Sequence, residues 1–214
     1  MEGFMYRIND IFYSIQGEGR NTGRAAVFVR FAGCNLRCSF CDTEFDTFRE
    51  MTADEIVTAI TAYPSRFVVL TGGEPTLQVD EAFIDLLHQH GFEVAMESNG
   101  TRPAPKNLDW LTVSPKVLGG EWKEVSGKRL PDELKIIFDD NTDPETYLSL
   151  LTIPADADTP TRSLSHFSPL LYLQPCDTGD AERNAIIINR CIDYIKEHPQ
   201  WRLSLQTHKL VGFK

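Results

Sequence analysis

Residues 67–75, "FVVLTGGEP", join an apolar run directly to two glycines, an acid and a proline. The apolar part is typical of a strand buried on both faces, and the Gly/Pro-rich part ends it. Five further apolar runs end in similar polar or Gly/Pro-rich stretches, namely "RFAGC" (30–34), "MESNGT" (96–101), "VSPK" (113–116), "YLQPC" (172–176) and "LQTHK" (205–209). Parallel strands of a (β/α) barrel all point one way, so these six ends would converge on one site.

The alternation of apolar runs with amphipathic segments predicts an α/β fold with a parallel sheet. The length favours a shortened, open (β/α)6-type partial TIM barrel with about six parallel strands. Strands are expected at Ala25–Phe31, Phe67–Thr71, Glu93–Glu97, Trp110–Val113, Leu134–Phe138, Leu170–Leu173 and Arg202–Leu205. Helices are expected at Thr52–Ala62, which opens with a capping box, at Asp80–His90, and at Ala181–Glu197 with Ile188, Cys191, Ile192 and Ile195 on one face. Residues 116–131 and 153–169 are expected to be surface loops.

Size and charge narrow the class of protein. The 214 residues suit a single domain spanning 1–214. With 31 acidic and 21 basic residues the net charge is −10, which opposes direct binding to nucleic acid or to anionic membranes. No apolar run has transmembrane length and no basic, apolar leader opens the chain, so a cytoplasmic location is expected.

Three of the five cysteines lie in "CNLRCSFCDT", residues 34–43, at C-x3-C-x2-C spacing. A structural zinc site would need a second ligand pair, and a redox pair would leave Cys34 without a role. A [4Fe-4S] cluster held by three thiolates, with one iron open to a small molecule, uses all three. Cys191 lies on the apolar stripe of a predicted helix, which is typical of a small core residue. Cys176 follows a predicted strand end, and its role stays open.

The cysteine spacing, with Phe40 before the last cysteine, resembles the radical S-adenosylmethionine (SAM) superfamily. The "GGEP" stretch at 72–75 strengthens the resemblance. Further stretches, "SIQGEG" (14–19), "CDT" (41–43), "ESNGT" (97–101), "VSPK" and "LSLQTHK" (203–209), make the chain similar to the 7-carboxy-7-deazaguanine synthase family. The ordered set covers nearly the whole chain, with residues 141–168 as the main silent region.

The resemblance implies a carbon–nitrogen lyase that converts 6-carboxy-5,6,7,8-tetrahydropterin to 7-carboxy-7-deazaguanine with loss of ammonia. A reduced [4Fe-4S] cluster would split SAM, and the 5′-deoxyadenosyl radical would take hydrogen from the pterin and later return it. No catalytic side chain is implied, because the protein positions the substrate and excludes water. The product would feed queuosine or related deazapurines.

The resemblance also assigns residues. Cys34, Cys38 and Cys41 would ligate the cluster, and Thr43 would bind Mg2+, although helix capping is the alternative for a threonine. SAM would contact Phe40, Cys41, Asp42, Gly72, Gly73, Glu74, Gly100, Ser114, Pro115, Lys116, Gln174, Pro175, Cys176 and Asp177. The pterin would contact Ile15, Gln16, Gly17, Glu18, Arg30, Ser98 and His208; His208 has barrel closure as an equal alternative.

Two other functions stay open. A glycyl-radical activating enzyme would share the cluster and "GGEP", but would leave "QGEG", "CDT" and "QTHK" without a purpose. A non-enzymatic iron–sulfur or zinc carrier would need a fourth protein ligand, for which Cys176 is the candidate. The family resemblance further implies a reductase partner such as flavodoxin or ferredoxin, and a homodimer.

Overall fold

A nine-stranded sheet organises the computed structural model, which describes residues 4–116, 130–148 and 169–214. The strand order is β3-β1-β2-β4-β5-β6-β7-β8-β9. The strands are β1 (Tyr6–Ile15), β2 (Ala25–Phe31), β3 (Arg49–Met51), β4 (Phe67–Gly72), β5 (Glu93–Ser98), β6 (Trp110–Val113), β7 (Glu133–Phe138), β8 (Leu170–Pro175) and β9 (Trp201–Leu203). The helices are α1 (Ala53–Thr61), α2 (Glu81–Gln89), α3 (Pro144–Leu148), α4 (Ala181–Glu197) and α5 (Thr207–Val211), with 3-10 turns η1 (Gly19–Asn21) and η2 (Pro75–Leu77).

The open, mixed α/β sheet confirms the predicted fold class. All seven predicted strands are present in the described residues as β2 and β4 to β9, and all seven run parallel, so the expectation of about six was one too low. β1 and β3 were not predicted, and both pair antiparallel. The missed β1 bends at an irregular register between Ile8 and Asp10, where Asn9 and Asp10 interrupt its apolar alternation.

Side chains alternate between the two faces of the parallel strands because the side-chain period of a strand is two. On β7, Leu134, Ile136 and Phe138 join the main hydrophobic core on the outer face. The intervening Lys135 and Ile137 line a pocket on the inner face. A smaller apolar cluster on that inner face contains Phe12, Ala26, Phe28, Phe67, Val69 and Ala95. The helix-covered outer face therefore supplies most of the core, and the inner face supplies the site.

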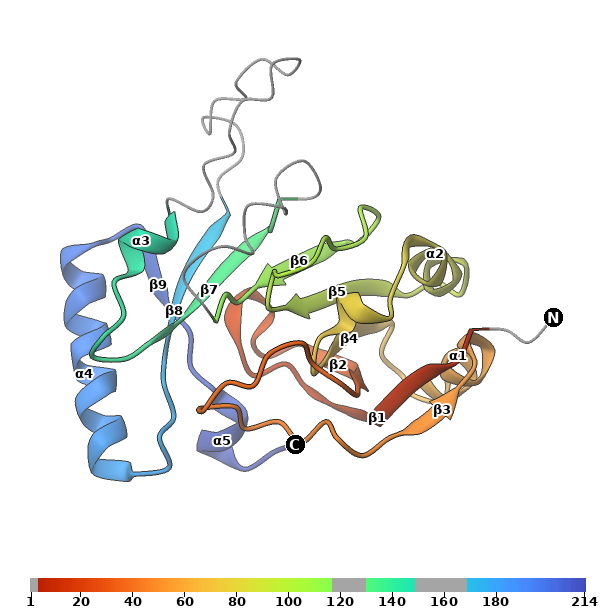
Figure 1. Ribbon diagram of the computed structural model, residues 1–214, viewed down its shortest axis with the longest axis horizontal. Coiled ribbons are helices and arrows are strands. Elements are labelled where there is room, and N and C mark those ends of the chain that lie inside the picture. Colours follow the sequence, from red (N-terminus) through yellow and green to blue (C-terminus); the bar gives the residue numbers. More distant parts are fainter. Residues whose placement is uncertain (1–3, 117–129, 149–168) are drawn as a thin grey trace, which may run out of the picture.

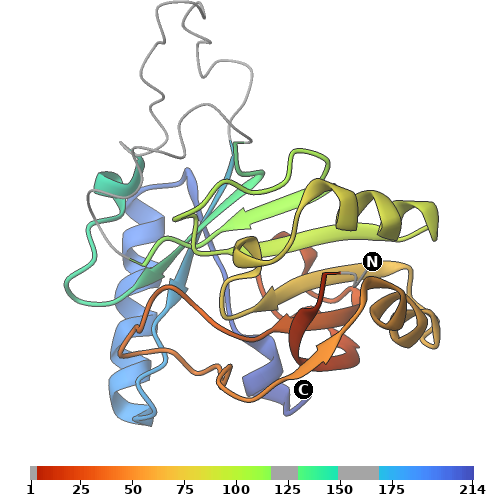
Figure 2. The ribbon, with the colours of Figure 1, turned by 45° about the vertical axis from the view of Figure 1, so that its right-hand side comes forward.

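Helices α1 to α4 pack on the outer face of the sheet, whereas α5 carries His208 and Lys209 of the pocket lining. Figures 1 and 2 show α4 beside β8 and β9, with α1 and α2 toward the opposite end of the sheet. The predicted capping box at the start of α1 is present: Glu55 N donates to Thr52 Oγ1 and Thr52 N donates to Glu55 Oε2. Asp80 caps α2 by accepting from Phe83 N at 2.9 Å. These caps fix where each helix leaves its strand.

The buried stripe of α4 differs slightly from the predicted one. Ile187 and Cys191 are fully buried, and Tyr194 and Ile195 pack against the same core. Cys191 is confirmed as a core residue, but Ile188 and Ile192 are only half-buried at the edge of the stripe. The buried stripe therefore runs through Ile187, Cys191 and Tyr194, and the Tyr194 ring packs against Phe138.

The chain after β9 bridges the open side of the sheet, between the last strand and β1. Thr207 N donates to Gly17 O at 3.1 Å, and Ser14 Oγ hydrogen-bonds to Lys214 O. A Cβ added at Gly17 would meet His208 Nδ1 at 2.5 Å, so glycine is required for this close approach. The C-terminal segment thus encloses the inner face that the open sheet alone would leave exposed.

No helix in the described ranges is both long and apolar enough to cross a membrane. The predicted loops at 116–131 and 153–169 lie almost wholly outside the described residues.

Candidate active site

A pocket of about 470 Å³ lies on the inner face of the sheet, within the size range of small-molecule sites. Its wall brings together the segment after β1, the cysteine loop, the ends of several parallel strands and the C-terminal segment. The predicted site residues that line it are Ile15, Gln16, Gly17, Glu18, Arg30, Cys34, Cys38, Phe40, Cys41, Asp42, Thr43, Gly72, Gly73, Ser98, Ser114, Lys116, Gln174, Pro175, Cys176, Asp177 and His208. Sequence positions almost 200 residues apart therefore share one cavity.

Three predicted site residues, Glu74, Gly100 and Pro115, lie behind the pocket wall instead. Glu74 is fully buried, and its carboxylate accepts from Ser98 Oγ at 2.9 Å and from Asn99 N at 2.7 Å. It also accepts from the backbone and hydroxyl of Thr76. These bonds join the ends of β4 and β5, so Glu74 shapes the wall, and its contact with a SAM ammonium stays a prediction.

The glycines of "GGEP" hold the cysteine loop by direct backbone packing. Gly73 N donates to Phe31 O, and Glu74 N donates to Gly33 O, both at 2.9 Å. A Cβ at Gly73 would lie 2.0 Å from Gly33 O, and Gly72 has a φ of +120°. Only glycine fits both positions, so the two motifs that are separate in sequence form one unit.

The three clustered cysteines are free and line the same pocket. Cys41 N donates to Cys38 O at 3.2 Å, and Leu36 N donates to Cys34 Sγ at 3.4 Å. Within the described ranges, no three Cys, His, Asp or Glu side chains converge as ligands of a single metal ion. Three free thiols on one loop suit a cluster with one open iron. Phe40 belongs to this loop, and the centre of its ring lies 5.9 Å from Lys116 Nζ.

Lys135 forms the centre of a buried ion cluster that we name the inner cluster: Glu18, Lys135 and Glu97. Lys135 Nζ lies 2.6 Å from Glu18 Oε2 and 3.0 Å from Glu97 Oε2. The Lys135 side chain is 5% exposed. Gln206 Nε2 donates to Glu18 Oε1 at 3.1 Å, and Gln16 Nε2 donates to Glu97 Oε1 at 3.4 Å. The inner cluster ties β7 and β5 to the segment after β1.

The two carboxylates of the inner cluster have pKa values shifted in opposite directions. Burial alone would raise the pKa of Glu18, but the charge and hydrogen bond of Lys135 outweigh it and lower the pKa to about 2. For Glu97, burial is the larger effect and raises the pKa despite Lys135. Burial opposes the charge of Lys135, yet the two carboxylates raise its pKa. Divergent carboxylate pKa values are a frequent property of functional sites.

A second lysine joins two carboxylates at the mouth of the pocket, and we name this set the rim cluster: Asp42, Lys209 and Asp177. Lys209 Nζ lies 2.6 Å from Asp42 Oδ2 and 2.8 Å from Asp177 Oδ2. Burial would raise the pKa of Asp42, but the hydrogen bond and charge of Lys209 lower it. The hydrogen bond from Lys209 is also the main cause that lowers the pKa of Asp177 to about 2. The rim cluster connects the cysteine loop to the chain after β8.

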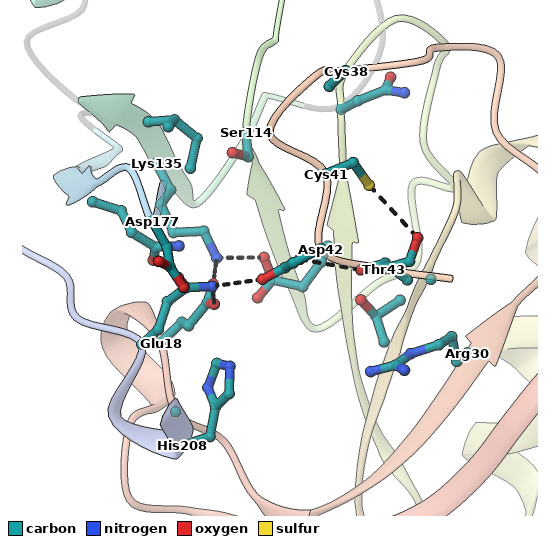
Figure 3. Close-up of a pocket in the computed structure, with 18 of the residues that line it drawn as sticks. Glu18, Arg30, Cys38, Cys41, Asp42, Thr43, Ser114, Lys135, Asp177 and His208 are labelled. Carbon is teal, nitrogen blue, oxygen red and sulfur yellow. Dashed lines mark hydrogen bonds and ion pairs between the residues drawn. The ribbon is translucent and has the colours of Figure 1, made fainter. Parts of the chain in front are cut away.

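Arg30 and Thr43 lie on the side of the pocket opposite Glu18, Lys135 and Asp177 (Figure 3). Arg30 Nε is buried without a hydrogen-bond partner in the described part of the chain. Its guanidinium carbon lies 5.3 Å from the centre of the Phe12 ring. An unpartnered buried guanidinium N–H is costly, and a ligand carboxylate would satisfy it.

From the sequence alone, no role was assigned to Glu97, Lys135, Gln206 or Lys209, although all four line the pocket. The strand "ELKIIF" (133–138) did contain a signal, because Glu133 and Lys135 alternate with apolar residues in a strand that should be buried on both faces. Gln206 and Lys209 belong to "LQTHK", whose place depends on how the C-terminal segment crosses to β1. Sequence spacing carries no signal for that crossing.

Comparisons with known proteins agree with this geometry. Residues 28–117 match the Radical SAM superfamily. The 7-carboxy-7-deazaguanine synthase of Bacteroides thetaiotaomicron is 44% identical over 210 residues, covering 98% of this chain and 100% of that protein. The same-named protein of Bradyrhizobium diazoefficiens is 42% identical over 232 residues, covering 98% and 99%.

A solved structure shares the fold as well as the sequence. The crystal structure of QueE from Escherichia coli matches with a TM-score of 0.71 and 28% identity, covering 94% of this chain and 93% of that chain. The radical SAM match implies a [4Fe-4S] cluster and SAM. The chain therefore belongs to the 7-carboxy-7-deazaguanine synthase family of radical SAM enzymes.

Proposed function

We propose that this protein converts 6-carboxy-5,6,7,8-tetrahydropterin to 7-carboxy-7-deazaguanine with release of ammonia. The observation that carries the proposal is the shared cavity, which the cysteine loop, the Gln16–Glu18 segment and Arg30 line together. A cofactor on the loop and a small polar ring between Glu18 and Arg30 would lie next to each other. The whole-length relatives named 7-carboxy-7-deazaguanine synthase support the proposal, and they do not favour the activase or carrier alternatives.

Cys34, Cys38 and Cys41 would hold the [4Fe-4S] cluster, and SAM would complete it. When bound, the two groups supply one-electron chemistry that no protein side chain provides. Lys116 suits the SAM carboxylate because its ammonium faces the pocket beside Phe40 and donates to Ser114 Oγ at 2.7 Å. Burial lowers the pKa of Lys116, and the charge of Lys135 lowers it further, so an arriving carboxylate would favour its charged form.

The substrate carboxylate would bind at Arg30, whose Nε–H has no acceptor among the described residues. Thr43 lies on the same side of the pocket (Figure 3), which supports a shared Mg2+ between its hydroxyl and the substrate carboxylate. The enclosing C-terminal segment would exclude water from the reacting ring. In this arrangement the protein binds and orients the pterin and supplies no covalent step.

An anaerobic turnover assay tests the proposed function. The reconstituted enzyme, SAM, a chemical reductant and the tetrahydropterin should give the deazaguanine product and ammonia in equal amounts, and Mg2+ should increase the rate. Cleavage of SAM that requires an added partner protein, with no pterin turnover, would contradict the proposal in favour of the activase. A zinc-loaded chain, or a cluster whose spectrum is unchanged by SAM, would contradict it in favour of the carrier.

Thr43→Ala tests the magnesium assignment. The variant should keep the cluster spectrum and SAM binding, because the cysteines are untouched, but should lose the rate increase that Mg2+ gives. Thr58→Ala is the control. The exposed Thr58 hydroxyl lies away from the pocket and donates to Asp54 O within α1. Equal stimulation of Thr43→Ala and wild type by Mg2+ would remove the metal role from Thr43.

The proposal extends to partners that the chain does not identify. A flavodoxin or ferredoxin reductase would supply the electron, and the protein would act as a homodimer in the cytoplasm, with one domain spanning 1–214. Light scattering checks the dimer, and coupled reduction with each candidate reductase checks the donor.

A further inference from the structure

The inner cluster places an ammonium and a carboxylate side by side on the pocket wall. Lys135 Nζ and Glu97 Oε2 are 3.0 Å apart, and both residues line the pocket. Lys135 lies buried between Leu134 and Ile136 in a strand whose other charged residue is Glu133, so its burial needs a reason beyond sheet stability. Neither residue belongs to the proposed contacts with the cluster, SAM, Mg2+ or the substrate carboxylate.

Each partner keeps hydrogen-bonding capacity for a ligand. Lys135 has three N–H donors, and among the described residues Glu18 and Glu97 use two. Glu97 Oε1 accepts only a long 3.4 Å bond from Gln16 Nε2 within the same ranges. By contrast, both oxygens of Glu18 have short partners, at 2.6 Å from Lys135 and 3.1 Å from Gln206. Glu97 is therefore the carboxylate with room for a ligand.

Together the pair offers the ligand two carboxylate oxygens as acceptors and one ammonium as a donor. The 2-amino-4-oxopyrimidine edge of a pterin is the complement, since its 2-amino group and N3–H donate and its O4 accepts. We propose that the Glu97–Lys135 pair binds this edge of the substrate and selects for the 2-amino group, an assignment that rests on the proposed function. Two N–H donors to one carboxylate make a charge-assisted, bidentate contact.

The pair and Arg30 lie on opposite sides of the pocket (Figure 3), as the two ends of the substrate require. The carboxylate of the pterin lies at the end of the bicyclic ring opposite the 2-amino group. Arg30 lies across the pocket from Lys135 (Figure 3). One molecule can therefore place its carboxylate toward Arg30 and its aminopyrimidinone edge toward Glu97 and Lys135. The raised pKa of Glu97 agrees, because burial disfavours its charge until N–H donors arrive.

Binding of two stable, oxidised analogues tests the inference on the reconstituted enzyme with SAM bound. The probes are 6-carboxypterin, which has the 2-amino group, and 6-carboxylumazine, which has a carbonyl oxygen in its place. Fluorescence titration of wild type should show about tenfold to hundredfold tighter binding of the pterin. Glu97→Gln should lose this preference or reverse it, because its amide N–H can donate to the 2-oxo group.

Glu133→Gln is the matched control, since Glu133 is a buried carboxylate on the same strand as Lys135 and does not line the pocket. It should keep the wild-type preference. If Glu97→Gln fails to fold, Glu97→Asp provides a second test, because it keeps the carboxylate but shortens the side chain by one methylene. Glu97→Asp should weaken pterin binding without improving lumazine binding.

The outcomes separate the inference from the proposed function. If wild type turns over the tetrahydropterin but Glu97→Gln or Glu97→Asp keeps the wild-type preference, the inference fails alone. If wild type neither turns over the tetrahydropterin nor binds either analogue, the proposed function fails and the inference fails with it.

Discussion

The inner and rim clusters have the same composition, one lysine between two carboxylates, and differ in exposure. In the inner cluster the side chains of Lys135, Glu18 and Glu97 are 5%, 19% and 23% exposed. In the rim cluster Lys209, Asp42 and Asp177 are 32%, 53% and 35% exposed. Water screens the rim charges, whereas the inner charges depend on each other.

The difference in exposure gives the two clusters different roles in the pocket. Removing one partner from a buried ion cluster leaves uncompensated charge, while removing one from an exposed cluster leaves a charge that water solvates. The inner cluster can therefore hold a fixed pattern of donors and acceptors for a ligand. The rim cluster joins the cysteine loop to the chain after β8. Breaking these exposed ion pairs when a ligand enters costs little free energy, because water solvates the separated charges.

Lys135→Met gives the largest expected effect. The variant leaves two neighbouring buried carboxylates without a cation, so its free energy of unfolding should fall by about 3–5 kcal/mol. Urea unfolding of wild type and variant measures this. A loss below about 1 kcal/mol, the range of exposed ion pairs, would abolish the distinction between the two clusters.

Glu133→Gln tests how a buried carboxylate near the inner cluster changes the pH dependence of stability. Burial, and then the charge of Glu97, raise the pKa of Glu133 from 4.5 to about 7. A raised acid pKa stabilises the fold below the unfolded value and loses that contribution as pH rises through the folded value, here between about pH 4.5 and pH 7. The shift corresponds to about 3 kcal/mol, so the variant should lose that much less stability than wild type between about pH 5 and pH 8. Parallel stability curves for the two proteins would show that Glu133 does not titrate there.

Arg30→Lys tests a pocket cation outside both clusters. Arg30 Nε has no partner in the described residues. The variant keeps the charge but loses the planar bidentate geometry, so 6-carboxypterin should bind about tenfold to hundredfold more weakly. Unsubstituted pterin, which lacks the carboxylate, should bind wild type and variant equally. Equal weakening of both compounds would place the carboxylate elsewhere.

Lys209→Met should have the smallest effect on stability. The rim cluster is exposed, so the free energy of unfolding should change by about 0–1 kcal/mol in urea. Half-saturation by SAM should still change, because Asp42 and Asp177 would lose the cation that joins them. A loss as large as that of Lys135→Met would mean that the rim is as structural as the interior.

Local sequence was enough to predict the parallel strands and the capped helices, whereas the family resemblance supplied most of the predicted pocket residues. Apolar runs predicted β2 and β4 to β9, and "TADE" predicted the capping box of α1. The expected convergence of polar strand ends also brought Cys34 and "GGEP" to one place. These features are local, so they depend on periodicity and on a few glycine contacts.

The remainder depends on contacts between distant segments. The antiparallel β1 carries Asn9 and Asp10 in its middle, and Gln16–Glu18 reach the pocket because residues 207–214 fill the gap beside them. The inner cluster joins Glu18, Glu97 and Lys135, and no spacing rule connects those positions. The four hydrogen bonds of Glu74 within the wall likewise had no signal in its motif, whose suggested contact with a ligand stays a prediction.

An anaerobic crystal structure of the reconstituted enzyme with SAM and the tetrahydropterin tests the central claim most directly. The account predicts the substrate carboxylate within hydrogen-bond distance of the Arg30 guanidinium, with the 2-amino group at Glu97 and O4 facing Lys135. A pterin bound in the reverse orientation, with its carboxylate on Lys135, or bound outside this pocket, would contradict the account.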